Sequence, residues 1–216
     1  MELPKLSLLF QKCLYGPFIH AENSADYYIE RERDRLYLFL ECSSGEEDWK
    51  NNFDFPAAPY KRMESEVWFC HRGFLRVWKS IEDEISTVLS DANVHSIVIS
   101  GYSHGAALGT LCHEYVWYNR PDLRDNIRSF GFGAPRVIWG LPSRSVRERF
   151  SGYTMIRNVN DIVTHLPPKL FGYTHVGELI SIGERGKYSG IDAHRPENIL
   201  RELIIYENKK PTQGSS

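Results

Sequence analysis

The sequence predicts a single α/β domain built around a largely parallel central sheet. Its 216 residues suffice for one domain and hardly for two, and 42% of them are hydrophobic, an ordinary value for a globular protein. Through the middle of the chain, strand-like segments alternate with helix-like segments, which is typical of parallel strands joined by helices. The strand expected at 94–100 turns into a helix at 106–119 within about five residues. We expect that strand to lie at the centre of the sheet.

Hydrophobic spacing places the other elements. Residues 36–40 are nearly all apolar and should lie deep in the sheet, whereas residues 74–89 carry apolar side chains at helical spacing. Pro121 ends the helix before it. The expected helices are 6–15, 74–89, 106–119 and 196–206. The expected strands are 25–33, 35–42, 67–73, 94–100, 127–133, 153–159 and 177–182.

Residues 49–60 are expected to form a long loop rich in aromatic residues and prolines. Loops of this length in compact domains are often functional. We therefore expect Trp49 and Phe53, together with Tyr102, to contact substrate. Core packing is the alternative for the loop aromatics. The polar tail 209–216 is expected to fray.

Composition argues against several classes of partner. The net charge of −2 gives no reason to expect nucleic acid or an anionic membrane as a partner, and no apolar run approaches the ~18 residues of a membrane span. The four cysteines contain no C-x-x-C pair and match no zinc or haem spacing, so we expect free buried thiols, no metal and no organic cofactor. The first residues lack a basic region followed by an apolar one, which favours a cytoplasmic location. The oligomeric state stays open.

The turn between the central strand and its helix reads Gly101-Tyr102-Ser103-His104-Gly105, a G-x-S-x-G pattern. A chain that passes from strand to helix so abruptly needs glycine on either side of the serine. The bend exposes the Ser103 hydroxyl at a helix N-terminus, where N–H groups favour negative charge, and directs the N–H of His104 toward an oxyanion. A plain structural turn is the alternative, since glycine and serine are common. The strand before the pattern and the helix after it favour a nucleophile.

A nucleophilic serine needs a base, and the base needs an orienting acid. Asp161 follows the end of the strand at 153–159, where a polar partner of Ser103 is expected; its alternative role is to cap the loop at Val163 or Thr164. Three histidines follow it. His165 is too close in sequence to Asp161, His175 precedes a strand, and His194 lies in a loop. Spacing favours His194 over His175 without excluding the latter.

Several segments together resemble the class 3 lipase family, the fungal triacylglycerol lipase-like branch of the α/β hydrolases. The segments are His71-Arg-Gly-Phe74, Gly101-Tyr-Ser-His-Gly-Ala-Ala-Leu-Gly109, Phe132-Gly-Ala-Pro-Arg-Val137, Asn160-Asp-Ile-Val163 with Leu166-Pro-Pro168, Tyr173-Thr-His-Val-Gly177 and Asp192-Ala-His194. They span residues 36 to 200 in the order that the family has. The resemblance implies an α/β-hydrolase-type three-layer sandwich with a mostly parallel central sheet. It also implies Ser103 as nucleophile, Asp161 as acid, His194 as base and His175 as a structural residue.

One segment departs from the family. Where the family has F-R-G-T or F-R-G-S before a D-W pair, this chain has Leu40-Glu-Cys-Ser43. Ser43 falls on the position whose hydroxyl helps to form the family's oxyanion hole, so the resemblance implies Ser43 beside His104 as an oxyanion donor. Cys42 stands where the family has glycine, and cysteine has no special access to positive φ.

The sequence therefore predicts a serine carboxylester hydrolase, a lipase or esterase that cleaves acylglycerol-like or other apolar acyl esters through an acyl-enzyme. Two alternatives stay open. One is a phospholipase or acyltransferase on the same fold. The other is a lipid-binding scaffold without activity, against which the intact Ser, Asp and His set argues.

Overall fold

The structure of the protein is a computed structural model, which describes residues 3–20, 25–42, 56–63 and 66–209. These residues form a main sheet of seven strands in the order β1-β2-β3-β6-β7-β9-β11. The strands are β1 (Ile19–His20), β2 (Ala25–Glu32), β3 (Arg35–Cys42), β6 (Ser96–Tyr102), β7 (Ile127–Phe132), β9 (Tyr153–Asn158) and β11 (Glu178–Ile182). The run from β3 to β11 is parallel, and β1 and β2 pair antiparallel at one edge.

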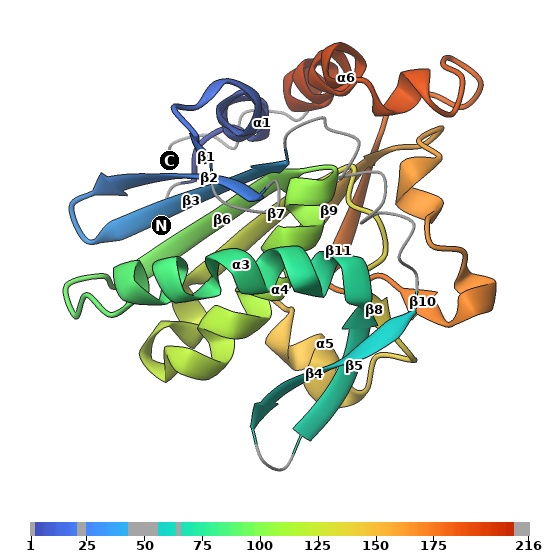
Figure 1. The fold of residues 1–216 in the computed structure, drawn as a ribbon. Coiled ribbons are helices and arrows are strands. Elements are labelled where there is room, and N and C mark those ends of the chain that lie inside the picture. The colour runs from blue at the N-terminus through green and yellow to red at the C-terminus, as the bar shows by residue number, and fades with distance from the viewer. Residues whose placement is uncertain (1–2, 21–24, 43–55, 64–65, 210–216) are drawn as a thin grey trace.

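Helices cover both faces of this sheet, as Figure 1 shows. The helices are α1 (Leu6–Tyr15), α3 (Arg72–Leu89), α4 (His104–Asn119), α5 (Arg144–Arg149) and α6 (Pro196–Lys209). Alternation along β3 sends Leu36, Leu38 and Leu40 into the core beneath α3 and α4. Its other side chains, Tyr37 and Phe39, enter a second core beneath α1 and α6. The three-layer sandwich with a mostly parallel sheet, expected from the sequence, is confirmed.

A second, antiparallel sheet was not expected from the sequence. Its order is β10-β8-β5-β4 within the described ranges, with β4 (Ala57–Met63), β5 (Glu66–His71), β8 (Ile138–Trp139) and β10 (Tyr173–Thr174). The prediction of a loop over 49–60 is wrong at its end, because residues 57–60 pair with β5. Residues 49–55, which include Trp49 and Phe53, lie outside the described residues.

Most boundaries agree with expectation to within a few residues. The bounds of α1 and β3 are as predicted, whereas β6 runs two residues further and delivers the chain directly to Ser103. Gly73, expected to end a strand, lies instead in the first turn of α3, which begins at Arg72. The Nδ1 of His71 accepts the N–H of Phe74 at 3.4 Å and caps this helix, so the helix begins earlier than the hydrophobic spacing indicated.

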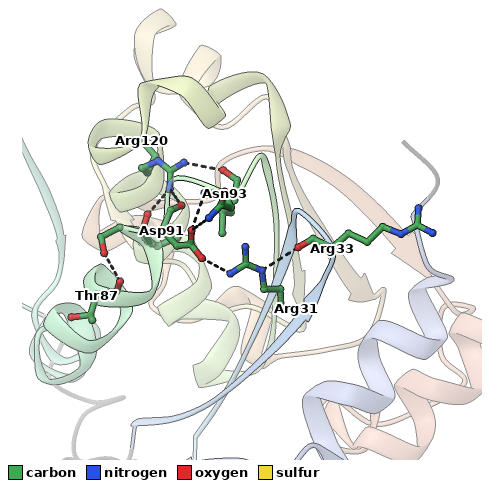
Figure 2. Close-up of polar contacts among 9 residues, drawn as sticks. Arg31, Arg33, Thr87, Asp91, Asn93 and Arg120 are labelled. Carbon is green, nitrogen blue, oxygen red and sulfur yellow. Dashed lines mark hydrogen bonds and ion pairs between the residues drawn. The ribbon is translucent and has the colours of Figure 1, made fainter.

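At the end of the sheet away from Ser103, polar side chains join neighbouring loops and strands through hydrogen bonds and an ion pair (Figure 2). Arg31 of β2 pairs with Asp91 in the α3–β6 connection. Arg120 donates to the carbonyls of Leu89, Asp91 and Val94, with 2.9 Å to the last of these. These bonds satisfy loop carbonyls and tie the β2–β3 hairpin to the loop before β6, the strand that leads to Ser103. Within the described ranges, no helix combines the length and apolar character that crossing a bilayer requires.

Candidate active site

Ser103 occupies a strained turn between β6 and α4. Its φ of 53° and ψ of −119° lie in a region that non-glycine residues rarely adopt. The N–H of Ser103 donates to the carbonyl of Phe132 on the neighbouring strand at 2.9 Å, which holds the turn against β7. The strained backbone departs from both strand and helix geometry at this one residue, so the side chain stands at the point where the sheet ends.

Both glycines of the G-x-S-x-G pattern are required by close backbone contacts. A Cβ on Gly101 would lie 2.3 Å from the carbonyl oxygen of Gly105. A Cβ on Gly105 would lie 2.1 Å from the carbonyl oxygen of Leu40, at the end of β3. The expected need for glycine on either side of the serine is therefore confirmed by packing, and the turn sits directly against the strand that leads to Ser43. Ser43 itself lies outside the described residues.

The structure brings together three of the side chains that the sequence singled out. The Nε2 of His194 lies 2.8 Å from the Oγ of Ser103, and its Nδ1 lies 2.8 Å from the Oδ2 of Asp161. The Asp161 carboxylate is fully buried, and the His194 side chain is 14% exposed. A hydroxyl, an imidazole and a carboxylate in this order form a continuous path for proton transfer.

Asp161 also caps its own loop. Its Oδ1 accepts the N–H of Val163 at 2.9 Å while Oδ2 faces His194. Asp161 thus makes both of the contacts considered from the sequence, one to a histidine and one to its own loop. The N–H of Val163 fixes the plane of the carboxylate, and the second oxygen is thereby aimed at the imidazole.

The loop that carries His194 contacts two other loops, through the side chain of Asn160 and the backbone of Gly133. Asn160 donates to the carbonyl of Glu184 at 2.7 Å and accepts the N–H of Gly186 at 2.9 Å. Gly133, after β7, has φ +60°, and a Cβ there would lie 2.9 Å from the Cε1 of His194. Sequence reasoning assigned neither residue to the site. Their roles depend on contacts that the fold brings about, and the sequence around them gave no signal for either.

His175, the alternative base, faces elsewhere. Its Nε2 lies 2.7 Å from the carbonyl oxygen of Thr164. Burial lowers the pKa of His175 to about 4, which keeps the ring neutral near pH 7. A neutral ring whose N–H binds a carbonyl fits the structural role that the family resemblance implied.

His104 is the first residue of α4, and its backbone N–H belongs to the first turn of the helix. That N–H stands next to the Ser103 turn, at the positive end of the helix. The side chain of His104 is buried with its ring 5.0 Å from that of Phe74. Burial, followed by the nearby His71, lowers the pKa of His104 to about 3. The ring is therefore neutral, and the polar feature of this residue near the serine is its N–H.

Tyr102, expected to contact substrate, lies against His194. Its hydroxyl donates to the backbone carbonyl of His194 at 2.6 Å, and the two rings are stacked with centroids 5.1 Å apart. Cys13, Cys70 and Cys112 are buried thiols outside any disulfide, as expected; the side chain of Cys42 lies outside the described residues.

Several solved structures with the same fold are fungal lipases. The chain superimposes on a fungal lipase from an inhibitor complex with a TM-score of 0.67 and 24% identity, over 77% of this chain and 65% of that one. It superimposes on the triacylglyceride lipase of Rhizomucor miehei with a TM-score of 0.63 and 23% identity, over 78% and 66% of the two chains. At these identities the likeness concerns the fold.

Curated proteins with similar sequences carry related names. The chain is 29% identical over 150 residues to a lipase of Rhizomucor miehei, which is 66% of this chain and 40% of that protein. It is 26% identical over 168 residues to secreted mono- and diacylglycerol lipase 1 of Fusarium solani, or 74% and 48% of the two chains. It is 36% identical over 102 residues to phospholipase A1-IIgamma of Arabidopsis thaliana, or 42% and 23%. The chain spans about 40% of the length of the Rhizomucor miehei lipase.

The family described as Lipase (class 3) matches residues 37–171, well over half of the chain. The match includes Ser103 and Asp161 and ends before His194, so the place of His194 rests on the geometry above. By sequence and by fold, the chain belongs to the class 3 lipase family.

Proposed function

We propose that the protein is a serine ester hydrolase that cleaves acylglycerol-like or other apolar acyl esters through an acyl-enzyme. The observation that carries the proposal is the chain of two hydrogen bonds, each 2.8 Å long, from Ser103 through His194 to Asp161. Membership of the class 3 lipase family and the names of its relatives support an ester as the substrate.

The first step is attack by Ser103 on the ester carbonyl. With the Nδ1–H of His194 donating to Asp161, Nε2 carries the free electron pair and accepts the proton of the Ser103 hydroxyl. The buried carboxylate offsets the charge of the imidazolium that forms. His194 then passes the proton to the leaving alkoxide, and the acyl group stays on Ser103.

The second step releases the acid. Water enters in place of the departed alcohol, gives its proton to His194 Nε2 and attacks the acyl-enzyme; the proton then returns to Ser103. In both steps the carbonyl oxygen becomes negative. The N–H of His104 is one donor to that oxyanion, and we assign the second to Ser43 on the sequence pattern alone.

A phospholipase is the second candidate, because one similar protein carries the name phospholipase A1. An acyltransferase would use the same site with an alcohol in place of water. A lipid-binding scaffold without activity is less well supported, since it would leave the hydrogen-bonded Ser103–His194–Asp161 arrangement without a use. The cytoplasmic location expected from the sequence stays a prediction.

The test is hydrolysis of a series of chromogenic esters, from acetate to palmitate, beside a diacylglycerol and a phosphatidylcholine. We expect turnover of the chromogenic esters and the diacylglycerol, and loss of nearly all of it in Ser103→Ala. Turnover of the phospholipid alone would favour the second candidate. A folded wild-type protein that cleaves none of these substrates would refute the proposal.

A further inference from the structure

We propose that Tyr102 is a positioning residue for His194: its hydroxyl anchors the main chain of the base, and its ring supports the imidazole. This inference rests on the proposed function, since it concerns the same site. It replaces the expected contact between Tyr102 and substrate with a contact inside the protein.

Two contacts join Tyr102 to His194. The phenolic hydroxyl donates to the His194 carbonyl oxygen at 2.6 Å. The two rings are nearly parallel, at an interplanar angle of 26° with centroids 5.1 Å apart. His194 is the last residue of the short 3-10 helix Asp192–His194, and an extended residue follows it. The Tyr102 contacts therefore fix both the backbone and the ring plane of this residue.

The two contacts matter for the site because Tyr102 is adjacent to Ser103 in the chain. Tyr102 is the last residue of β6, and Ser103 follows it directly. One strand end thus presents the nucleophile and also holds the residue that must accept its proton. Because reacting groups tolerate little misplacement, a fixed separation between Ser103 and His194 favours the reactive geometry.

Tyr102 is itself supported by α1. The Phe10 ring meets the Tyr102 ring edge-on, with centroids 5.4 Å apart, and also packs against Phe132. Phe10 is fully buried. Two bonds from Ser7 to Glu207, of 3.0 and 2.6 Å, tie α1 to α6, the helix that begins two residues after His194. The helix that packs against Tyr102 is therefore tied to the helix that follows His194.

The hydroxyl stays a donor over the pH range of ester hydrolysis. Burial, followed by the negative charges of Asp161 and Glu197, raises the pKa of Tyr102 well above that of an ordinary phenol. The bond to the His194 carbonyl therefore does not titrate with the catalytic groups.

The test is Tyr102→Phe, which removes the hydroxyl and keeps the ring. Tyr27→Phe is the matched control, because the Tyr27 hydroxyl also makes a 2.6 Å bond, to Glu84, on the opposite face of the sheet. With a short soluble ester, we expect Tyr102→Phe to lower kcat about tenfold, the rate equivalent of one ordinary hydrogen bond, with KM within about twofold of wild type. The control should keep wild-type kcat and KM. An unchanged kcat would overturn the proposal, and a rise in KM alone would return Tyr102 to substrate binding.

A second measurement does not need turnover. The proton between His194 Nδ1 and Asp161 should give a low-field proton NMR resonance, identified by its loss in His194→Ala. We expect Tyr102→Phe to shift or broaden this resonance and Tyr27→Phe to leave it unchanged. If the wild-type protein cleaves no ester, the proposed function fails, whereas the positioning role is still decided by this resonance. A resonance identical in wild type and Tyr102→Phe would contradict that role.

Discussion

The backbone of Gly133 lies directly against the imidazole of His194. A Cβ at position 133 would come within 2.9 Å of His194 Cε1, 3.0 Å of its Nδ1 and 3.2 Å of the Asp161 Oδ2. Gly133 also has φ +60°, and its N–H donates to the carbonyl of Ile156 at 2.8 Å. Because Gly133 has no side chain, the backbone of the turn after β7 can lie against the imidazole and bound one side of the site.

Gly133→Ala should therefore disable the site by contact. The added methyl group would push the imidazole away from Ser103, and we expect kcat to fall about a hundredfold, the effect of a misplacement of roughly 1 Å. Positive φ alone costs an alanine about 1–2 kcal/mol of stability. Gly140→Ala is the matched control, since Gly140 has φ +98° and, apart from its chain neighbours, no atom of the described residues lies within 4 Å of an added Cβ. Equal loss of kcat in both variants would show that strain, and not contact with His194, is responsible.

The two candidate bases should respond differently to alanine. His194→Ala removes the proton acceptor of Ser103 and should abolish acylation while the melting temperature stays near that of wild type. His175→Ala removes a buried bond to Thr164 and should lower the free energy of unfolding by about 1–3 kcal/mol, with activity per folded molecule largely kept. Thermal denaturation and ester hydrolysis of both variants measure this. A stable, inactive His175 variant beside an active His194 variant would overturn the assignment.

Because histidines are buried in their neutral form, we predict that the free energy of unfolding falls in mild acid. Burial lowers the pKa of His113 to about 4, and its ring is held by Ser129 and by the carbonyl of Arg149, each at 2.8 Å. In the unfolded chain histidine titrates near pH 6.5, so between about pH 6.5 and 4 the unfolded state binds more protons. Falling pH therefore favours unfolding in this window, by at most about 1.4 kcal/mol per pH unit for each such histidine.

Urea unfolding at pH 7 and pH 5 measures this slope, and His113→Gln isolates the contribution of one ring. The variant should be less stable at pH 7 because it loses buried hydrogen bonds, yet lose less stability than wild type between the two pH values. An equal loss in both proteins would show that His113 is not buried in its neutral form.

The sequence predicted those parts of the fold that have a local signal. Apolar runs such as 36–40 and helical spacing such as 74–89 located most strands of the main sheet and four of its helices to within a few residues. The short elements β1 and α5 were not predicted. The second sheet was not predicted because two of its strands, β8 and β10, are two residues long, which is too short to show any periodicity. The pairing of β5 with β8 joins residues that lie almost 70 positions apart in the chain.

The residues of the candidate site also differ in whether the sequence carries a local signal for them. Ser103 was predictable because its glycines and flanking elements are neighbours in sequence, and Asp161 because it follows a strand end. Spacing could not choose between His175 and His194, since the contact with Ser103 joins residues 91 positions apart. The roles of Gly133 and Tyr102 depend on the His194 ring being brought to them by the fold, and nothing local to either residue indicates it.

The central claim is that Ser103 is a nucleophile activated by His194, and covalent labelling tests it most directly. The protein is incubated with an alkyl organophosphonate, digested, and mapped by mass spectrometry, beside the Ser103→Ala and His194→Ala variants. We predict one adduct per chain, on Ser103, absent from Ser103→Ala and formed far more slowly in His194→Ala. A folded wild-type protein that takes up no phosphonate, or takes it up on another residue, would contradict the account.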